Sequence, residues 1–188
     1  MEFRDLTAEE IEVRVQSIKV QNGKPTGAIL LLYKNARCDM NILDEEVGSE
    51  NWQRDHYECK GNMYCRVGIY CKTKDDKYQW VWKSDCGVES NTEAQKGEAS
   101  DSFKRACTNF GIGRELYTSP FIWIPAEAFK HYDTGRKDRN GNPIFATNDR
   151  FAVEKIRIEN KKITGISIIN TSTKADDIKD KRVFVWPV

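Results

Sequence analysis

The chain has 188 residues, of which 39% are hydrophobic and 31% charged, and its formal net charge is +1. These values predict one globular domain and exclude a strongly basic protein, so any site for a polyanion has to be local. No apolar run approaches the roughly 18 residues of a membrane-spanning helix, and the acidic start MEFRDLTAEE lacks a signal-peptide pattern. A cytoplasmic location and no membrane partner are therefore expected.

The cysteines and histidines do not have the spacing of a metal site. None of the six cysteines forms a C-x-x-C pair, and His56 and His131 lie far apart. The cysteines are therefore predicted to act as small hydrophobic side chains rather than as zinc ligands or disulfide partners. No metal and no other cofactor is expected.

The first third of the chain predicts extended segments followed by a helix. EIEVRVQSIKV (10–20) alternates apolar and polar residues, which is typical of a strand or an extended arm, and AILLLY is a short buried run. Asn35 fits the N-cap of a helix whose apolar residues recur at helical spacing through ARCDMNILDEEV, and Gly48 suits its end.

Three strands are predicted next, in WQRDHYEC, MYCRVGIYCKT and YQWVWKSDC, and their short turns favour an antiparallel meander. One face of the middle strand carries Tyr64, Arg66, Tyr70 and Lys72. Aromatic rings interleaved with cations are typical of a surface for single strands, but a face covered by a helix or a neighbouring subunit has the same pattern. Trp80 and Trp82 share one strand face and are interpreted as core or subunit contacts.

A helix follows, with a capping box at Thr92 and Gln95, an apolar stripe that includes Phe103 and Phe110, and a stop at Gly111. Residues 52–111 thus predict a β-β-β-α core. The fold class is α+β: an antiparallel β-meander packed on this helix, with an N-terminal strand and helix and a C-terminal β-hairpin.

The C-terminal third contains a segment rich in Gly, Asn and Asp (131–149), which is predicted to be a long loop. Its Arg136, Lys137 and Arg139 are either solvated or part of a second DNA site. RFAVEKIRI and ITGISII predict the hairpin, and RVFVWPV a final strand.

Cations follow one side of the predicted helix. Lys96, Ser100 and Lys104 recur every four residues beside the aromatic stripe, and Arg105 lies about 100° further round. Two cations and a hydroxyl suit a phosphate backbone. Gly97 costs about 1 kcal/mol relative to alanine within a helix, which indicates that space is needed there. The alternative is a solvated edge whose cations pair with Glu98 and Asp101.

EAQKGEASDSFKRACTNFGIGRELY resembles the helix that characterises the Rad52 superfamily of single-strand annealing proteins, with the phage and prophage members of Sak type most similar. ARCDMNILDEEVGSENWQ resembles the family's preceding helix, and VWKSDCGVES the last strand before the characteristic helix. The resemblance covers about residues 10–125. The residues in register are Asp101, Lys104, Arg105, Ala106, Phe110 and Gly111.

The resemblance implies a protein without enzymatic activity that binds single-stranded DNA and anneals complementary strands, independently of ATP, in recombination and repair, with phage recombination as the setting. It also implies a ring or helical filament of identical subunits and a single-strand-binding protein as a possible partner. Residues 1–125 would form the annealing core, and residues 126–188 a loop and hairpin extension of the same domain. The implied DNA contacts are Lys104, Arg105, Lys96, Ser100 and Arg37.

Arg66 is added to these DNA contacts from its place on the middle strand rather than from a motif. Thr108 departs from the pattern, because some family members have a further basic residue there. The resemblance does not extend to the recombinase-binding tail of eukaryotic members, and such a tail is not expected here.

Two other functions stay open at this point. One is a module that coats single strands or loads a recombinase without annealing. The other is a metal-dependent nuclease that uses Asp85, Glu89, Glu93 and Lys96, although the spacing differs from the usual Glu-x-Lys.

Overall fold

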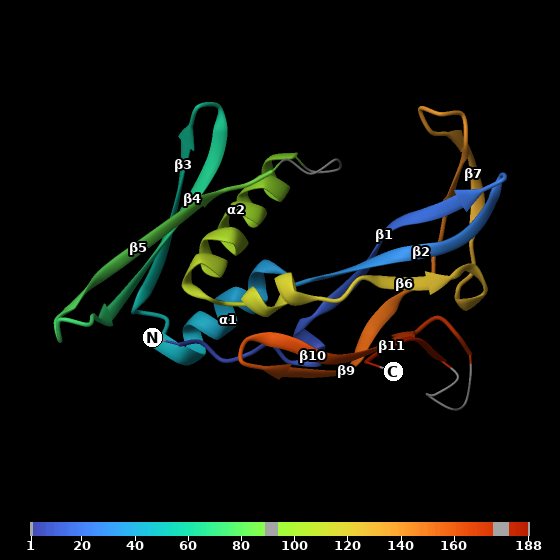
Figure 1. Cartoon of the computed structure of the whole chain (residues 1–188). Coiled ribbons are helices and arrows are strands. Elements are labelled where there is room, and N and C mark those ends of the chain that lie inside the picture. The colour runs from blue at the N-terminus through green and yellow to red at the C-terminus, as the bar shows by residue number, and fades with distance from the viewer. Residues whose placement is uncertain (1, 89–93, 175–180, 188) are drawn as a thin grey trace. The chain divides into compact units, whose positions relative to one another are not determined.

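The computed structural model describes residues 2–88, 94–174 and 181–187, with the side chains of the second helix described from residue 97 (Figure 1). The contacts divide the chain into two units. Unit 1 comprises Met1–Asp5 and Lys34–Arg114, and unit 2 comprises Leu6–Tyr33 and Glu115–Val188. The mixture of mostly antiparallel strands with two α-helices among the described residues confirms the α+β class.

Unit 1 contains two helices and a three-stranded sheet. Its elements are α1 (Ala36–Val47), β3 (Trp52–Cys59), β4 (Asn62–Lys72), β5 (Tyr78–Cys86) and α2 (Ala94–Phe110). The predicted cap of α1 is confirmed, because the Asn35 side chain accepts the backbone N–H of Cys38 at 3.0 Å. Gly48 ends this helix with a φ of 87°, which favours glycine.

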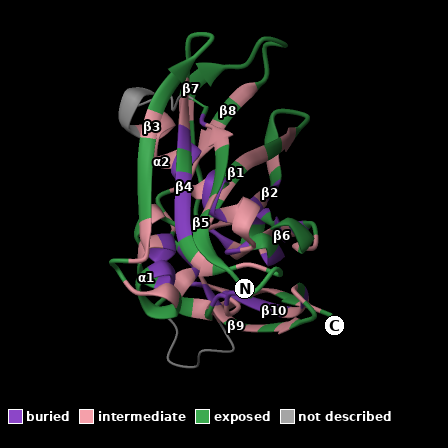
Figure 2. Ribbon diagram, turned by 90° about the vertical axis from the view of Figure 1, so that its left-hand side faces the viewer, coloured by how far each residue is buried: buried purple, intermediate pink, exposed green. Residues whose placement is uncertain are grey.

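The sheet of unit 1 is antiparallel, with β4 between β3 and β5. Alternation along the strands gives it an inner face and an outer face. The inner face packs against α2 and buries Cys65, Val67 and Ile69 of β4. Figure 2 shows β4 as the most buried of the three strands. The outer face carries Arg66 and Gly68, which pair in register with Ser84 and Trp82 of β5.

α2 is fixed to the sheet by its apolar stripe. Phe103, Ala106 and Cys107 are fully buried, and the Phe103 ring lies 6.1 Å from that of Trp52, centroid to centroid. Burial raises the pKa of the Cys107 thiol well above its usual value. Gly111 follows with a φ of 109°, consistent with the predicted stop. The capping box predicted at Thr92 and Gln95 lies outside the described residues.

Glycine permits a close approach at the end of β5. A Cβ atom on Gly87 would lie 2.1 Å from the carbonyl oxygen of Glu98 in α2. The Glu98 carboxylate in turn accepts the backbone N–H of Met63, at the start of β4, at 2.8 Å. These contacts hold the first described turns of α2 against the sheet.

Unit 2 is built mainly of strands. They are β1 (Glu12–Gln21), β2 (Lys24–Tyr33), β6 (Ile122–Pro125), β7 (Tyr132–Lys137), β8 (Pro143–Ala146), β9 (Phe151–Glu159), β10 (Lys162–Asn170) and β11 (Arg182–Trp186). Short 3-10 helices lie at Ala8–Glu10, Arg114–Thr118 and Ala126–Ala128. Six strands form one antiparallel sheet in the order β11-β10-β9-β1-β2-β6. The predicted C-terminal hairpin and final strand are β9–β10 and β11.

The prediction of a long loop at residues 131–149 is wrong, because β7 and β8 pair there as a separate hairpin. Four of the Gly, Asn and Asp residues, Asp138, Asn140, Gly141 and Asn142, form the tight turn between these strands. Asp138 accepts the backbone N–H groups of Asn140 and Asn142, both at 2.8 Å, and these hydrogen bonds lower its pKa.

The six cysteines are all free. Cys38, Cys65 and Cys107 are buried, as small hydrophobic side chains would be, whereas Cys59 is exposed. None of the helices in the described part of the chain is long and apolar enough to cross a membrane.

Candidate nucleic-acid interface

A groove of about 460 Å³ lies in unit 1 between the start of α1, β3 and α2. Arg37 of α1, Arg54 and His56 of β3, and Ser100 of α2 line it. Among the described residues no carboxylate lines it. Residues from three elements thus place two guanidinium groups and a hydroxyl around one concave surface, a combination that suits phosphate oxygens.

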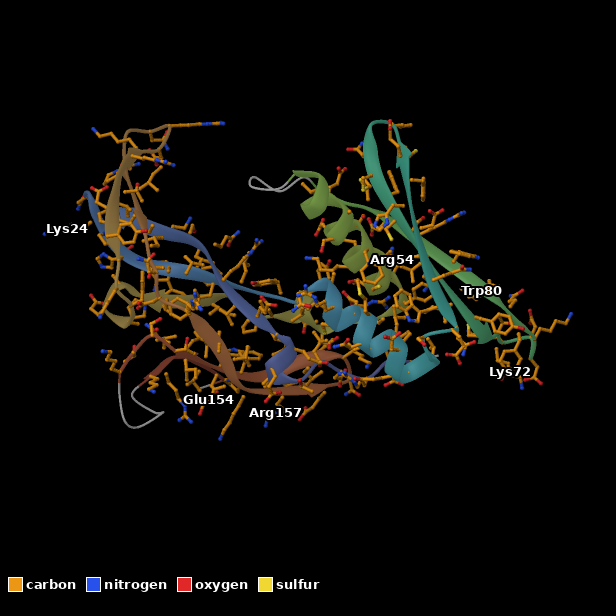
Figure 3. The ribbon with its side chains drawn as sticks, turned by 180° about the vertical axis from the view of Figure 1, so that it is seen from behind. Lys24, Arg54, Lys72, Trp80, Glu154 and Arg157 are labelled. Atoms are coloured by element: carbon orange, nitrogen blue, oxygen red, sulfur yellow. The ribbon has the colours of Figure 1, made fainter. Side chains whose placement is uncertain are left out.

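Arg54 is the groove residue that the sequence did not single out. Its guanidinium lies over the ring of Phe103, 4.7 Å from the ring centroid, on the helix side of the sheet (Figure 3). Among the described residues neither Arg54 nor Arg37 has a carboxylate partner. The alternation of WQRDHYEC places Arg54 on the face of Trp52, but only the position of α2 makes that face one wall of a groove.

Hydrogen bonds fix the walls of the groove. The ring nitrogen Nε2 of His56 lies 3.1 Å from the carbonyl oxygen of Ala99, which links β3 to α2 next to Ser100. The indole nitrogen of Trp52 donates to Asp44 of α1 at 2.6 Å, which links the same strand to the other helix. The groove is therefore preorganised before any ligand arrives.

Lys104 lies on the α1 side of α2, one turn after Ser100. Its Nζ atom is 3.9 Å from Asp101, and its charge partly offsets the rise that burial causes in the pKa of the nearby Asp39 of α1. Asp39 forms an ion pair with the buried Lys34. Burial nevertheless dominates and raises the pKa of Asp39 to about 6.

The other predicted DNA contacts lie elsewhere. Arg105 faces the opposite edge of α2, where its Nε atom donates to Asp85 of β5 at 3.1 Å. Arg66 lies on the outer face of the sheet and pairs with Asp55 at 3.0 Å. Lys96 belongs to α2, but its side chain lies outside the described residues. The structure thus brings Arg37 and Ser100 into the groove, places Lys104 beside them and separates Arg105 and Arg66 from them.

The solvated edge that was the alternative for α2 is present only in part. Glu98 is engaged by the backbone of Met63, and Asp101 accepts the backbone N–H of Val88 at 3.2 Å while it also lies near Lys104. The acidic side chains of the helix therefore serve mainly to attach α2 to neighbouring backbone.

The outer face of the sheet carries exposed aromatic side chains. Trp80 and Trp82 are 39% and 42% exposed, so the interpretation of these residues as core is wrong, and contact with another subunit stays a prediction. The reason is that α2 covers the opposite face, towards which the alternation of YQWVWKSDC directs Val81. Tyr70 is likewise exposed and lies on the side of the sheet away from α2.

The nuclease arrangement has little support in the described residues. Asp85 is held by Arg105 and by the amide of Asn109, and it also accepts the backbone N–H of Cys86. Glu89 and Glu93 lie outside the part of the chain that the structure describes. No group of potential metal ligands occurs among the described side chains.

Comparison with known proteins gives a relative and a family. The chain is 30% identical over 106 residues to the single-stranded DNA-binding protein DdrA of Deinococcus radiodurans. This alignment covers 54% of the chain and 47% of the relative, so the chain spans about half the length of that protein. The model of the Rad52/22 family of double-strand break repair proteins matches residues 7–132. Because this match covers more than half of the sequence, the chain belongs to the Rad52/22 family.

Proposed function

We propose that the protein binds single-stranded DNA along the groove of unit 1 and anneals complementary strands without ATP during recombination and repair. The observation that carries this proposal is the groove itself. Arg37, Arg54 and Ser100 converge from three elements on a surface whose described lining contains no carboxylate.

In this mechanism the cations hold the phosphates and leave the bases free to meet a second strand. Arg37 and Arg54 contact successive phosphates, Ser100 donates to a phosphate oxygen, and Lys104 continues the path along α2. Lys96, one turn before Ser100, extends the path in the other direction. Arg105, on the opposite edge of α2, contacts the DNA only where the strand passes round the helix. No covalent bond is made or broken, so the protein needs no catalytic residue.

The family and the relative support this proposal. The family is one of double-strand break repair proteins, and the name of the relative describes single-stranded DNA binding. We further propose that the β3–β4–β5 sheet and α2 act as the β-β-β-α binding core within an annealing region at residues 1–125, with residues 126–188 as its extension.

We also propose that identical subunits form a ring or helical filament, so that their grooves join into one path for the strand. A phage recombination system, with a single-strand-binding protein as partner, is the proposed setting. The similarity of the α2 sequence to phage annealing proteins supports this setting.

An annealing assay with two complementary labelled oligonucleotides, without ATP, tests the function. We expect Arg37→Ala with Arg54→Ala to weaken strand binding and to lower its dependence on salt by about 0.7 in log–log slope for each phosphate that the variant no longer binds. Arg157→Ala is the matched control, because this arginine is exposed on β9 in unit 2.

Each result has a distinct meaning. Unchanged affinity and salt slope in the double variant would show that the groove is not the binding site. Binding without annealing by the wild-type protein would favour the alternative function, a module that coats single strands or loads a recombinase.

A further inference from the structure

We propose that the outer face of the β3–β4–β5 sheet is a second surface for single-stranded nucleic acid, which binds the bases by stacking. This surface lies on the opposite side of the sheet from the groove. It extends the proposed function, on which it rests only for the kind of ligand. We define the aromatic row as Tyr78, Tyr70, Trp80 and Trp82.

The four rings form a continuous row across β4 and β5. The centroid distances are 5.8 Å from Tyr78 to Tyr70, 5.6 Å from Tyr70 to Trp80 and 5.9 Å from Trp80 to Trp82. Each ring therefore touches the next, and the row offers neighbouring aromatic surfaces at the spacing of successive side chains on a sheet.

The row is open to solvent over its whole length. Tyr70, Trp80 and Trp82 are each about 40% exposed and Tyr78 is 64% exposed. A Cβ atom on Gly68 would lie 2.7 Å from the Trp82 ring, so this ring lies where a side chain of β4 would otherwise stand. Figure 3 shows Trp80 on the side of the sheet away from Arg54. The groove and the row are therefore separate surfaces.

Cations stand at both ends of the row. The Arg66 guanidinium lies over Trp82, 5.1 Å from the ring centroid, and Lys72 pairs in register with Tyr78. Each cation has an exposed carboxylate partner, because Arg66 pairs with Asp55 at 3.0 Å and Lys72 with Asp76 of the β4–β5 turn at 2.5 Å. Such exposed pairs are weak, so a phosphate can compete for either cation. Rings for bases, with cations beside them for phosphates, are the combination that binds single strands without sequence preference.

The composition of the outer face fits single-stranded nucleic acid. In the described strands β3, β4 and β5, alternation directs no Val, Leu, Ile or Met side chain to the outer face, whereas the inner face receives Val67, Ile69 and Val81. Aromatic rings and arginine are also common in protein interfaces, so contact with another subunit is one outcome of the test. Aromatic rings without aliphatic neighbours suit flat bases.

Two probes of equal length separate stacking from phosphate binding: oligodeoxythymidylate, and an abasic deoxyribose-phosphate strand. We expect the wild-type protein to prefer the strand with bases. Trp80→Leu keeps an apolar side chain but removes the ring, and should reduce this preference roughly tenfold, whereas Trp80→Phe should largely retain it. Phe121→Leu is the control, because Phe121 is 70% exposed in unit 2.

The results distinguish this proposal from the groove. If Arg37→Ala with Arg54→Ala weakens both probes equally, and Trp80→Leu affects only the strand with bases, both surfaces are supported. If the wild-type protein binds both probes equally through the groove, or if Trp80→Leu retains the preference, the outer-face proposal is overturned and the groove stands. If only Trp80→Leu has an effect, the groove is wrong and the outer face stands.

If the outer face instead contacts another subunit, a change in the mass of the oligomer would show it. If Trp80→Leu dissociates an oligomer, measured by light scattering, while the preference for bases is unchanged, the outer face contacts another subunit and the proposal is overturned. Thermal unfolding of Trp80→Leu and Trp80→Phe shows whether each variant is folded. If Trp80→Leu is unfolded, retention of the preference for bases by the folded Trp80→Phe still tests the role of the ring.

Discussion

The two faces of the three-stranded sheet come from the same strands and differ in burial and in side-chain composition. The inner face buries aliphatic side chains of β4 under α2, and two of its polar residues, Arg54 and His56, form one wall of the groove. The outer face is aromatic and open, with its charges at the ends of the row. One residue of register separates the wall of the proposed phosphate-binding groove from the proposed stacking surface, because alternate side chains of a strand point to opposite sides.

The largest expected effect on stability concerns the buried ion pair between Lys34 and Asp39 of α1, in contrast to the exposed pair on the outer face of the sheet. Asp39→Ala would leave Lys34, which is only 5% exposed, charged without its partner, at a cost of about 3–5 kcal/mol in the free energy of unfolding. Urea denaturation measures this. Replacing both residues, as Lys34→Met with Asp39→Leu, should recover much of the loss. A double variant as unstable as Asp39→Ala would contradict the explanation by an unpaired buried charge.

The next largest difference is expected between alanine substitutions at Gly87 and at Gly68, in the free energy of unfolding that each costs. Gly87→Ala places a methyl group against the Glu98 carbonyl, which belongs to the helix backbone and has little freedom to move, so we expect a loss of about 1–3 kcal/mol. Gly68→Ala meets only the half-exposed Trp82 ring, which can turn away. Its cost should be smaller, with a change in tryptophan fluorescence. Equal costs would show that the end of β5 is not tightly held.

Variants on the two faces of the sheet should also differ in how they change nucleic-acid binding. Arg54→Gln removes a cation from the inner side and should lower the log–log salt slope by about 0.7 for one phosphate contact. Trp80→Leu on the outer side should leave this slope unchanged. Titrations of a labelled strand at several salt concentrations measure both variants. A change of slope in Trp80→Leu would mean that the two faces share one binding path.

The smallest effect is expected for the exposed ion pair of the outer face. Asp55 and Arg66 are each about half exposed, so Asp55→Asn should change the free energy of unfolding by less than about 1 kcal/mol. Because it frees Arg66, the same variant should bind single strands slightly more tightly. Weaker binding would argue against a phosphate contact at Arg66.

Local patterns predicted most of the elements in unit 1. Asn35 and Gly48 marked the ends of α1, and strict alternation marked the faces of β4, because caps and side-chain direction depend on neighbours in the chain. The pattern failed at residues 131–149. The turn residues around Asp138 predicted a loop, and the two short strands beside them have too few apolar residues to show the alternation of a strand.

Sequence patterns alone specified which residues share a helix side or a strand face, and the resemblance of α2 indicated the family. Only the packing of the elements showed that α2 covers the face of β4 that carries Val67 and leaves the opposite face in solvent. That packing directs Lys104 towards Asp39 of α1 and Arg105 towards Asp85, makes Arg54 part of a groove, and leaves Trp80 in solvent. The physical reason is that periodicity fixes directions within one element, whereas burial and charge pairing depend on which elements pack together.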